Sequence, residues 1–127
     1  MADNKPSKDD LDYEDLLEVT YDALVEGGFR DICIADAEDI PEPKPIDGHI
    51  PDMQAVNSKG IPFVFEICMP ETYAELELIE RFQAFTKHVA EVKGQFVAIV
   101  PDGDEGLVAA FIEEHKFPDE RLTIWEA

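Results

Sequence analysis

The fold of this chain is decided by two short runs, HIPDMQAV at residues 49–56 and PFVFEIC at residues 62–68. The polar segment NSKG at residues 57–60 separates them, and Asn and Gly tolerate the positive φ angles that tight hairpins require. The two runs therefore predict a β-hairpin, with Asp52 partway along its first strand and Glu66 near the end of its second strand.

The second strand of this hairpin is largely apolar on both faces. Side chains alternate across a strand, so Val64, Glu66 and Cys68 share one face, and the opposite face carries only apolar residues. This pattern is typical of a covered, central strand. A glutamate there is costly unless it is paired, protonated or bound to a metal, which makes Glu66 a candidate functional residue. A salt bridge from Arg81 or Arg30 would also satisfy it.

Apolar periodicity, capping signals and Gly or Pro breaks divide the rest of the chain into elements. They predict helices over about residues 11–26, 73–92 and 103–115, and strands over about 29–35, 95–100 and 121–125. Capping boxes are expected at Thr72 with Glu75 and at Asp102 with Glu105. The resulting order, α-β-β-β-α-β-α-β, predicts an α/β (α+β) fold in which helices flank a mixed β-sheet.

Three segments complete this outline. In the strand at 29–35, alternation places Ile32 and Ile34 on one face and Phe29 and Cys33 on the other. Residues 36–47 form an acidic, proline-rich connection that cannot be regular structure throughout. Residues 1–9 are expected to be a flexible acidic N-terminus, and residues 10–127 a single domain.

Composition indicates a globular protein. The chain has 127 residues, of which 45% are hydrophobic and 31% charged. No apolar run approaches the roughly 20 residues of a membrane helix, and the N-terminus lacks a basic region followed by an apolar stretch. We therefore expect a cytoplasmic protein without a membrane span. Cys33 and Cys68 are too widely spaced for a disulfide scaffold or a zinc site and are interpreted as small buried residues.

The charge balance limits the choice of partners. Thirty acids against 10 bases give a net charge of −20, and the acids are spread along the chain. Nucleic-acid binding draws on Lys and Arg against phosphates, so the charge disfavours it without excluding it. Acidity can serve solubility alone, or can match a basic partner or mimic nucleic acid. We expect a protein partner or self-association, for which edge pairing around Ile124 and Trp125 is one route.

The order of elements, with Pro51-Asp52 on the second strand and Glu66-Ile67-Cys68 on the third, resembles the restriction-endonuclease-like (PD-(D/E)XK) nuclease superfamily over about residues 10–101. The resemblance implies that Asp52, Glu66 and the Ile67 carbonyl hold Mg²⁺ or Mn²⁺, which polarises a phosphate and activates a water. It also implies a further acidic residue from the first helix, for which Glu18 and Asp15 are candidates.

Cys68 is where this chain departs from that pattern, because the superfamily has a lysine at this position. A thiol lacks a fixed positive charge, and a thiolate beside two carboxylates is disfavoured. A relocated base could come from Lys87, Arg81 or Gln83 on the long helix, whereas Lys59 in the turn lies too far from Glu66.

Structural interpretations of the same residues remain open. Asp52 could simply follow Pro51 in a bulge and bond to backbone, and His49 could be a turn residue without a role. Three functions are then in competition. The favoured one is a catalytically degenerate member of the superfamily that acts as a binding or accessory protein. The alternatives are an active Mg²⁺-dependent nuclease using Lys87 or Arg81, and an acidic interaction module unrelated to nucleic acid.

Overall fold

The structure is a computed structural model, which describes residues 8–69, 73 and 75–126. It contains, in chain order, α1 (Lys8–Glu26), β1 (Arg30–Ile34), β2 (Met53–Val56), β3 (Pro62–Ile67), α2 (Leu76–Val92), β4 (Gln95–Val100), α3 (Glu105–Glu114) and β5 (Leu122–Glu126). The element order expected from the sequence is confirmed.

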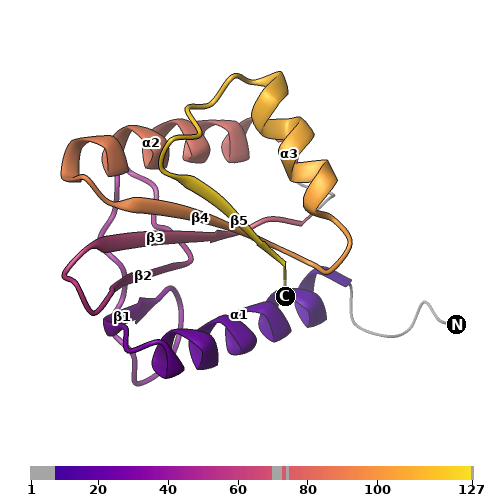
Figure 1. Cartoon of the computed structure of the whole chain (residues 1–127). Coiled ribbons are helices and arrows are strands. Elements are labelled where there is room, and N and C mark those ends of the chain that lie inside the picture. Colours follow the sequence, from indigo (N-terminus) through magenta and orange to yellow (C-terminus); the bar gives the residue numbers. More distant parts are fainter. Residues whose placement is uncertain (1–7, 70–72, 74, 127) are drawn as a thin grey trace, which may run out of the picture.

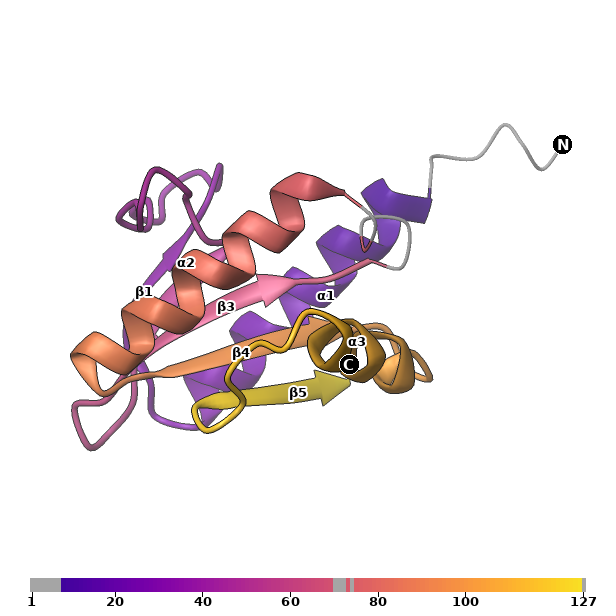
Figure 2. The same ribbon diagram turned by 90° about the horizontal axis from the view of Figure 1, so that it is seen from above.

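The five strands form one mixed sheet in the spatial order β1-β2-β3-β4-β5. Strand β2 pairs antiparallel with β1 and with β3, whereas β4 pairs in parallel with β3 and with β5. Helix α1 covers one face of the sheet, and α2 and α3 lie on the other (Figures 1 and 2). This is the α/β fold with flanking helices that the sequence predicts. No helix in the described part of the chain is long and apolar enough to cross a membrane.

Two apolar layers hold the helices on the sheet. Alternation along β3 divides its side chains between them, with Val64 in the layer beneath α2 and α3 and Phe65 in the layer above α1. The α2 layer is rich in aromatic contacts, since the buried ring of Phe82 meets three other phenylalanine rings at centroid distances of 5.0–5.3 Å. This packing fixes α2, and therefore Arg81 on it, over the end of β3.

The hairpin predicted at residues 49–68 forms with the expected turn. The side-chain oxygen of Asn57 accepts hydrogen bonds from the backbone N–H groups of Lys59 and Ile61, each at 2.9 Å. Gly60 adopts φ +83°, which a side chain would strain. The turn therefore sets the register that pairs Met53 with Phe65.

One expectation about this hairpin is wrong. Strand β2 begins at Met53, so Asp52 precedes the strand and does not lie partway along it. Pro51 has no N–H to give to a ladder, and His49 forms an isolated bridge with Ile46 instead of pairing with β3. Because Asp52 lies in irregular backbone before β2, the direction of its side chain is not set by the alternation of a strand.

The alternation predicted for β1 is wrong for Phe29, whereas Ile32 and Ile34 share one face as expected. Asp31 adopts φ +54°, and the register shifts between Arg30 and Cys33, which marks a β-bulge. The extra residue lets Phe29, Ile32 and Ile34 all pack in the α1 layer.

The remaining differences concern element ends. Helix α3 begins one residue after its N-cap Asp104, which makes no side-chain capping bond, so the capping box at Asp102 does not form. Thr72, of the other expected box, lies outside the described residues, as do residues 1–7 of the expected flexible N-terminus; α1 begins at Lys8.

Candidate functional site

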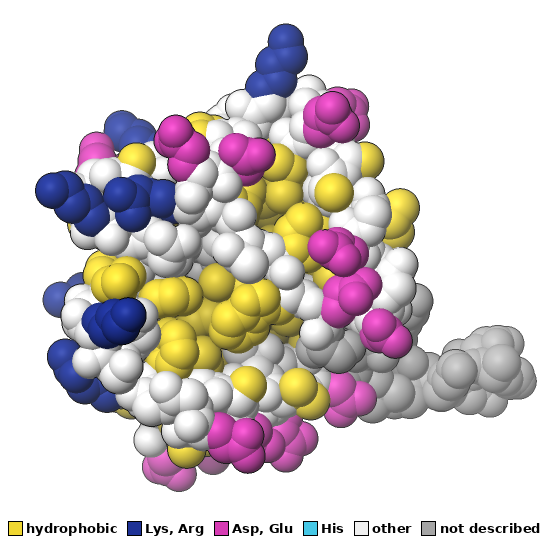
Figure 3. Space-filling view, viewed as in Figure 1, with side chains coloured by type: hydrophobic (Ala, Val, Ile, Leu, Met, Phe, Trp, Pro, Cys, Tyr) yellow, Lys and Arg dark blue, Asp and Glu magenta, His cyan; other side chains and the backbone are white. Residues whose placement is uncertain are grey.

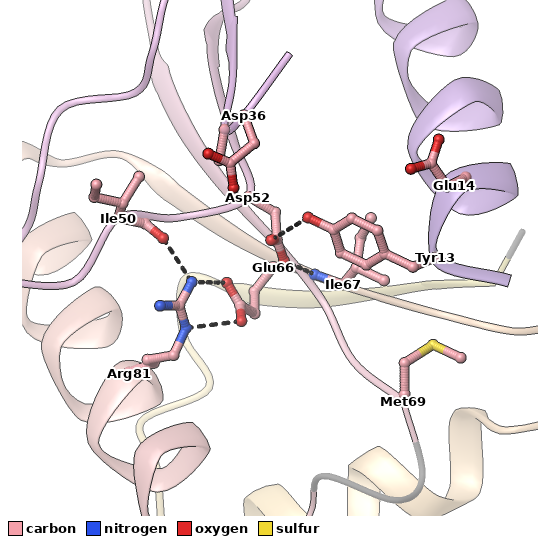
Figure 4. A pocket seen from close by; sticks show the side chains of 10 residues that line it. Tyr13, Glu14, Asp36, Ile50, Asp52, Glu66, Ile67, Met69 and Arg81 are labelled. Carbon is pink, nitrogen blue, oxygen red and sulfur yellow. Dashed lines mark hydrogen bonds and ion pairs between the residues drawn. The ribbon is translucent and has the colours of Figure 1, made fainter. Parts of the chain in front are cut away.

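A cleft of about 510 Å³ opens where α1, the approach to β2, the end of β3 and α2 meet (Figure 4). Its lining residues are Tyr13, Glu14, Ala35, Asp36, Ile50, Asp52, Glu66, Ile67, Met69 and Arg81. Four of the residues singled out from the sequence therefore line one cleft: Asp52, Glu66, Ile67 and Arg81.

Both carboxylate oxygens of Asp52 accept hydrogen bonds from within the chain. The Tyr13 hydroxyl of α1 donates to Oδ1 at 2.6 Å, and the backbone N–H of Ile67 donates to Oδ2 at 2.8 Å. Asp52 thus ties α1 to the end of β3. The backbone bond is the structural interpretation that the sequence left open, here combined with a tyrosine that the sequence did not identify.

Glu66 is engaged at both oxygens by Arg81. Arg81 Nε donates to Oε2 at 2.9 Å and Nη2 donates to Oε1 at 2.8 Å, in a bidentate ion pair. Nη2 also donates to the Ile50 carbonyl at 2.6 Å. The guanidinium carbon lies 5.3 Å from the centroid of the Phe85 ring, and Nη1 lies 3.8 Å from the exposed Glu77 carboxylate. Arg81 is therefore fixed on several sides.

The electrostatics of the cleft are dominated by burial. Burial, followed by the Asp52 charge, raises the pKa of Glu66 to about 8, although Arg81 opposes the shift. Burial also raises the pKa of Asp52, which the hydrogen bond from Tyr13 opposes. Asp52, Glu66 and the Arg81 guanidinium together carry a net negative charge when both acids are ionised, so the cleft favours uptake of a proton near neutral pH.

Cys68 does not face the cleft. Its side chain is fully buried in the α2 layer, with Sγ 3.7 Å from the Glu66 carbonyl oxygen. Burial, followed by the Glu66 and Asp52 charges, raises the pKa of the thiol well above its usual value. The position at which the resemblance implies a lysine therefore holds a neutral thiol.

The other candidates lie away from the cleft. Lys87 is exposed on α2 and is not a lining residue, and Glu18 and Asp15 are exposed on α1. Among the α1 side chains that the structure describes, Tyr13 and Glu14 line the cleft. Tyr13 falls on the apolar stripe of the helix, where the sequence offers no reason to separate its hydroxyl function from packing.

Mg²⁺, the ion that the resemblance implies, prefers six oxygen ligands. The four carboxylate oxygens of Asp52 and Glu66 each accept a hydrogen bond, and the Arg81 guanidinium lies directly against Glu66. Within the described residues, no group of three or more His, Cys, Asp or Glu side chains is arranged to hold a metal ion. As arranged, the donor set does not fit the ion.

Comparisons with known proteins give one finding. No protein-family model and no curated protein matches the chain. Among solved structures, it is similar to a repair endonuclease from Pyrococcus abyssi, with 16% sequence identity and a TM-score of 0.47 over 98% of this chain and 49% of that chain. The chain therefore spans about half the length of that endonuclease.

Proposed function

We propose that this chain is a catalytically degenerate protein of the restriction-endonuclease-like type, which acts as a binding or accessory protein. The bidentate pair of Arg81 with Glu66 carries the proposal. It supplies, from within the chain, the positive charge that a metal ion would otherwise bring to the carboxylates.

The contacts around Arg81 explain why a metal would compete poorly. Metal-assisted hydrolysis of a phosphodiester requires carboxylates that are open to a cation. A cation approaching Glu66 would have to displace a guanidinium held by two carboxylate bonds and by the Ile50 carbonyl. Removing a partner from a buried ion pair costs about 3–5 kcal/mol. A metal ion that replaces the Arg81 guanidinium would have to offset this loss before it could bind favourably.

Two further observations support loss of catalysis. Cys68 is neutral and directed into the core, so it cannot stabilise charge on a phosphate. The net charge of −20 repels the phosphate backbone that a nuclease has to approach. Acidic surface is compatible instead with a protein partner.

A second candidate is an active metal-dependent nuclease in which Arg81 is the relocated basic residue. The observation that favours it is that Arg81 lines the cleft with 15% of its side chain exposed, close to Asp52 and Glu66. Lys87 is a weaker choice, because it is exposed outside the lining. An acidic module with an accidental motif is less favoured still, because Asp52 and Glu66 share one cleft.

The deciding experiment combines metal binding with cleavage. Thermal unfolding is followed with and without millimolar Mg²⁺ or Mn²⁺, and plasmid and single-stranded DNA are incubated with the protein under the same conditions. We expect neither stabilisation nor cleavage. A ligand at a hundredfold excess over its dissociation constant would stabilise by about 2.7 kcal/mol. Stabilisation and cleavage that both disappear in Asp52→Asn and Glu66→Gln would overturn the proposal in favour of the nuclease.

A further inference from the structure

Strand β5 leaves one edge of the sheet open. It is the last strand in the sheet and pairs with β4 alone among the described strands. The Arg121 carbonyl accepts from Phe96 N at 2.8 Å, so the backbone of Arg121 faces β4. Backbone groups alternate in direction along an extended strand, so the N–H and C=O of Ile124 face the outer edge. Such an edge can pair with an added strand.

A hollow lies on each side of this edge. The hollow between α3 and β5 has a volume of about 630 Å³, and the one between α1 and β5 about 420 Å³. Apolar side chains line both: Ile112, Phe117, Leu122 and Ile124 in the first, and Val19, Ala23 and Trp125 in the second. Figure 3 shows hydrophobic surface above and below the central band where Figure 1 places β5. An added strand points alternate side chains to opposite faces, so both hollows could be filled at once.

The charged residues around this edge favour one kind of binding partner. The lining of the two hollows includes four acids (Glu105, Glu113, Asp119 and Glu126) and one base, Lys116. A second copy of the chain carries the same net charge of −20. Repulsion therefore disfavours pairing between two copies and favours a cationic partner.

We propose that the β5 edge binds an extended segment of a partner protein that has apolar residues at alternate positions and Lys or Arg beside them. Backbone pairing with Ile124 supplies part of the affinity, and the hollows and their acids supply the selectivity. This inference does not rest on the carboxylate cleft, so it holds whether or not that cleft is catalytic.

The test uses the full chain and a library of random nonapeptides, from which binders are selected and the strongest is synthesised. We expect enrichment of alternating apolar residues with Lys or Arg. Binding should change the fluorescence of Trp125, the single tryptophan, and slow hydrogen exchange at the Ile124 amide. Affinity should fall about tenfold in Glu113→Lys/Asp119→Lys, because each loses a favourable charge. The matched variant Glu80→Lys/Glu91→Lys, exposed on α2 outside both hollows, should bind almost as wild type.

Several results would overturn the proposal. Enrichment of acidic or non-alternating peptides, or no enrichment, would exclude this partner chemistry. Unchanged hydrogen exchange at the Ile124 amide would place peptide binding elsewhere. Equal loss of affinity in the two charge variants would mean that the overall charge of the protein, and not the acids of the hollows, governs binding. Sedimentation that shows a dimer with protected Ile124 would assign the edge to a second copy.

Discussion

Glu66 and Arg81 form a pair in which each side chain depends on the other. Glu66 is 5% exposed, and its carboxylate is charged only at a cost that the guanidinium offsets. At pH 9, above the raised pKa of Glu66, we expect Arg81→Met to lower the free energy of unfolding by about 3–5 kcal/mol, measured by urea denaturation. Methionine keeps an apolar stem against Phe85, so the loss reports mainly on charge.

Two variants control this prediction. Arg81→Met/Glu66→Gln removes both charges and should recover most of the lost stability, because no carboxylate is then left without its cation. Arg30→Met removes an arginine whose side chain is 60% exposed and should change the unfolding free energy by less than about 0.5 kcal/mol. Equal losses in the single and double Arg81 variants would contradict the pairing argument.

The raised pKa of Glu66 predicts a pH dependence of stability. Its ordinary pKa is 4.5 and its folded pKa is about 8, so the folded state holds an additional proton between these values. The free energy of unfolding should therefore fall as pH rises from about 4.5 to 8, by an amount on the order of 4 kcal/mol.

Urea denaturation across this pH window, on the wild type and on Glu66→Gln, isolates the contribution of Glu66. The variant should show a shallower slope, because it cannot take up that proton. Glu77→Gln, whose side chain is 70% exposed, should keep the wild-type slope. A slope in Glu66→Gln as steep as in the wild type would assign the effect to overall charge repulsion.

Of the four acids that line the cleft, the sequence identifies Glu66 because an acid on an apolar strand needs an explanation, and Asp52 through the resemblance to the nuclease superfamily. It also names Arg81 as a partner for Glu66, with Arg30 as the alternative. Tyr13 could not be found in this way, since its position fits the apolar stripe of α1. The use of the Ile67 N–H by Asp52 depends on the exact backbone path before β2, which composition and periodicity do not determine.

At the scale of elements, order and type follow from periodicity, whereas ends and irregularities follow from local backbone geometry. The bulge at Asp31 and the late start of β2 both occur where a hydrogen-bond ladder is interrupted, by a positive φ and by Pro51. A period of two residues detects the strand but not an inserted residue within it. Alternation therefore places Ile32 and Ile34 correctly but assigns Phe29, on the other side of the bulge, to the wrong face.

The turn between α2 and β4 contains a glycine, Gly94, that packs closely against the backbone of Pro62. A Cβ on Gly94 would lie 2.5 Å from the Pro62 carbonyl oxygen, which is backbone and cannot rotate away. We expect Gly94→Ala to lower the free energy of unfolding by about 1–3 kcal/mol, measured by urea denaturation. Gly106→Ala, in α3 with open space around the new Cβ, should leave stability unchanged or raise it by up to about 1 kcal/mol. Equal effects would mean that the junction can shift without strain.

At the scale of the whole molecule, the excess of acids acts against the compact state. Few cations are available to offset it, and Arg81, the most constrained of those described above, serves Glu66 within the cleft. The proposals of a non-catalytic cleft and of a cationic partner at β5 both depend on this field, because it disfavours phosphate and a second copy alike.

This field predicts that salt stabilises the protein. Raising NaCl from about 10 mM to about 1 M shortens the Debye length from about 30 Å to about 3 Å, which screens repulsion across the molecule but hardly affects the contact between Arg81 and Glu66. We expect Tm, measured by calorimetry at pH 8, to rise with NaCl, and to rise less in Glu80→Lys/Glu91→Lys, which carries four fewer net negative charges. A Tm that falls with salt would mean that surface ion pairs outweigh repulsion, and the charge argument against a second copy at β5 would then fail as well.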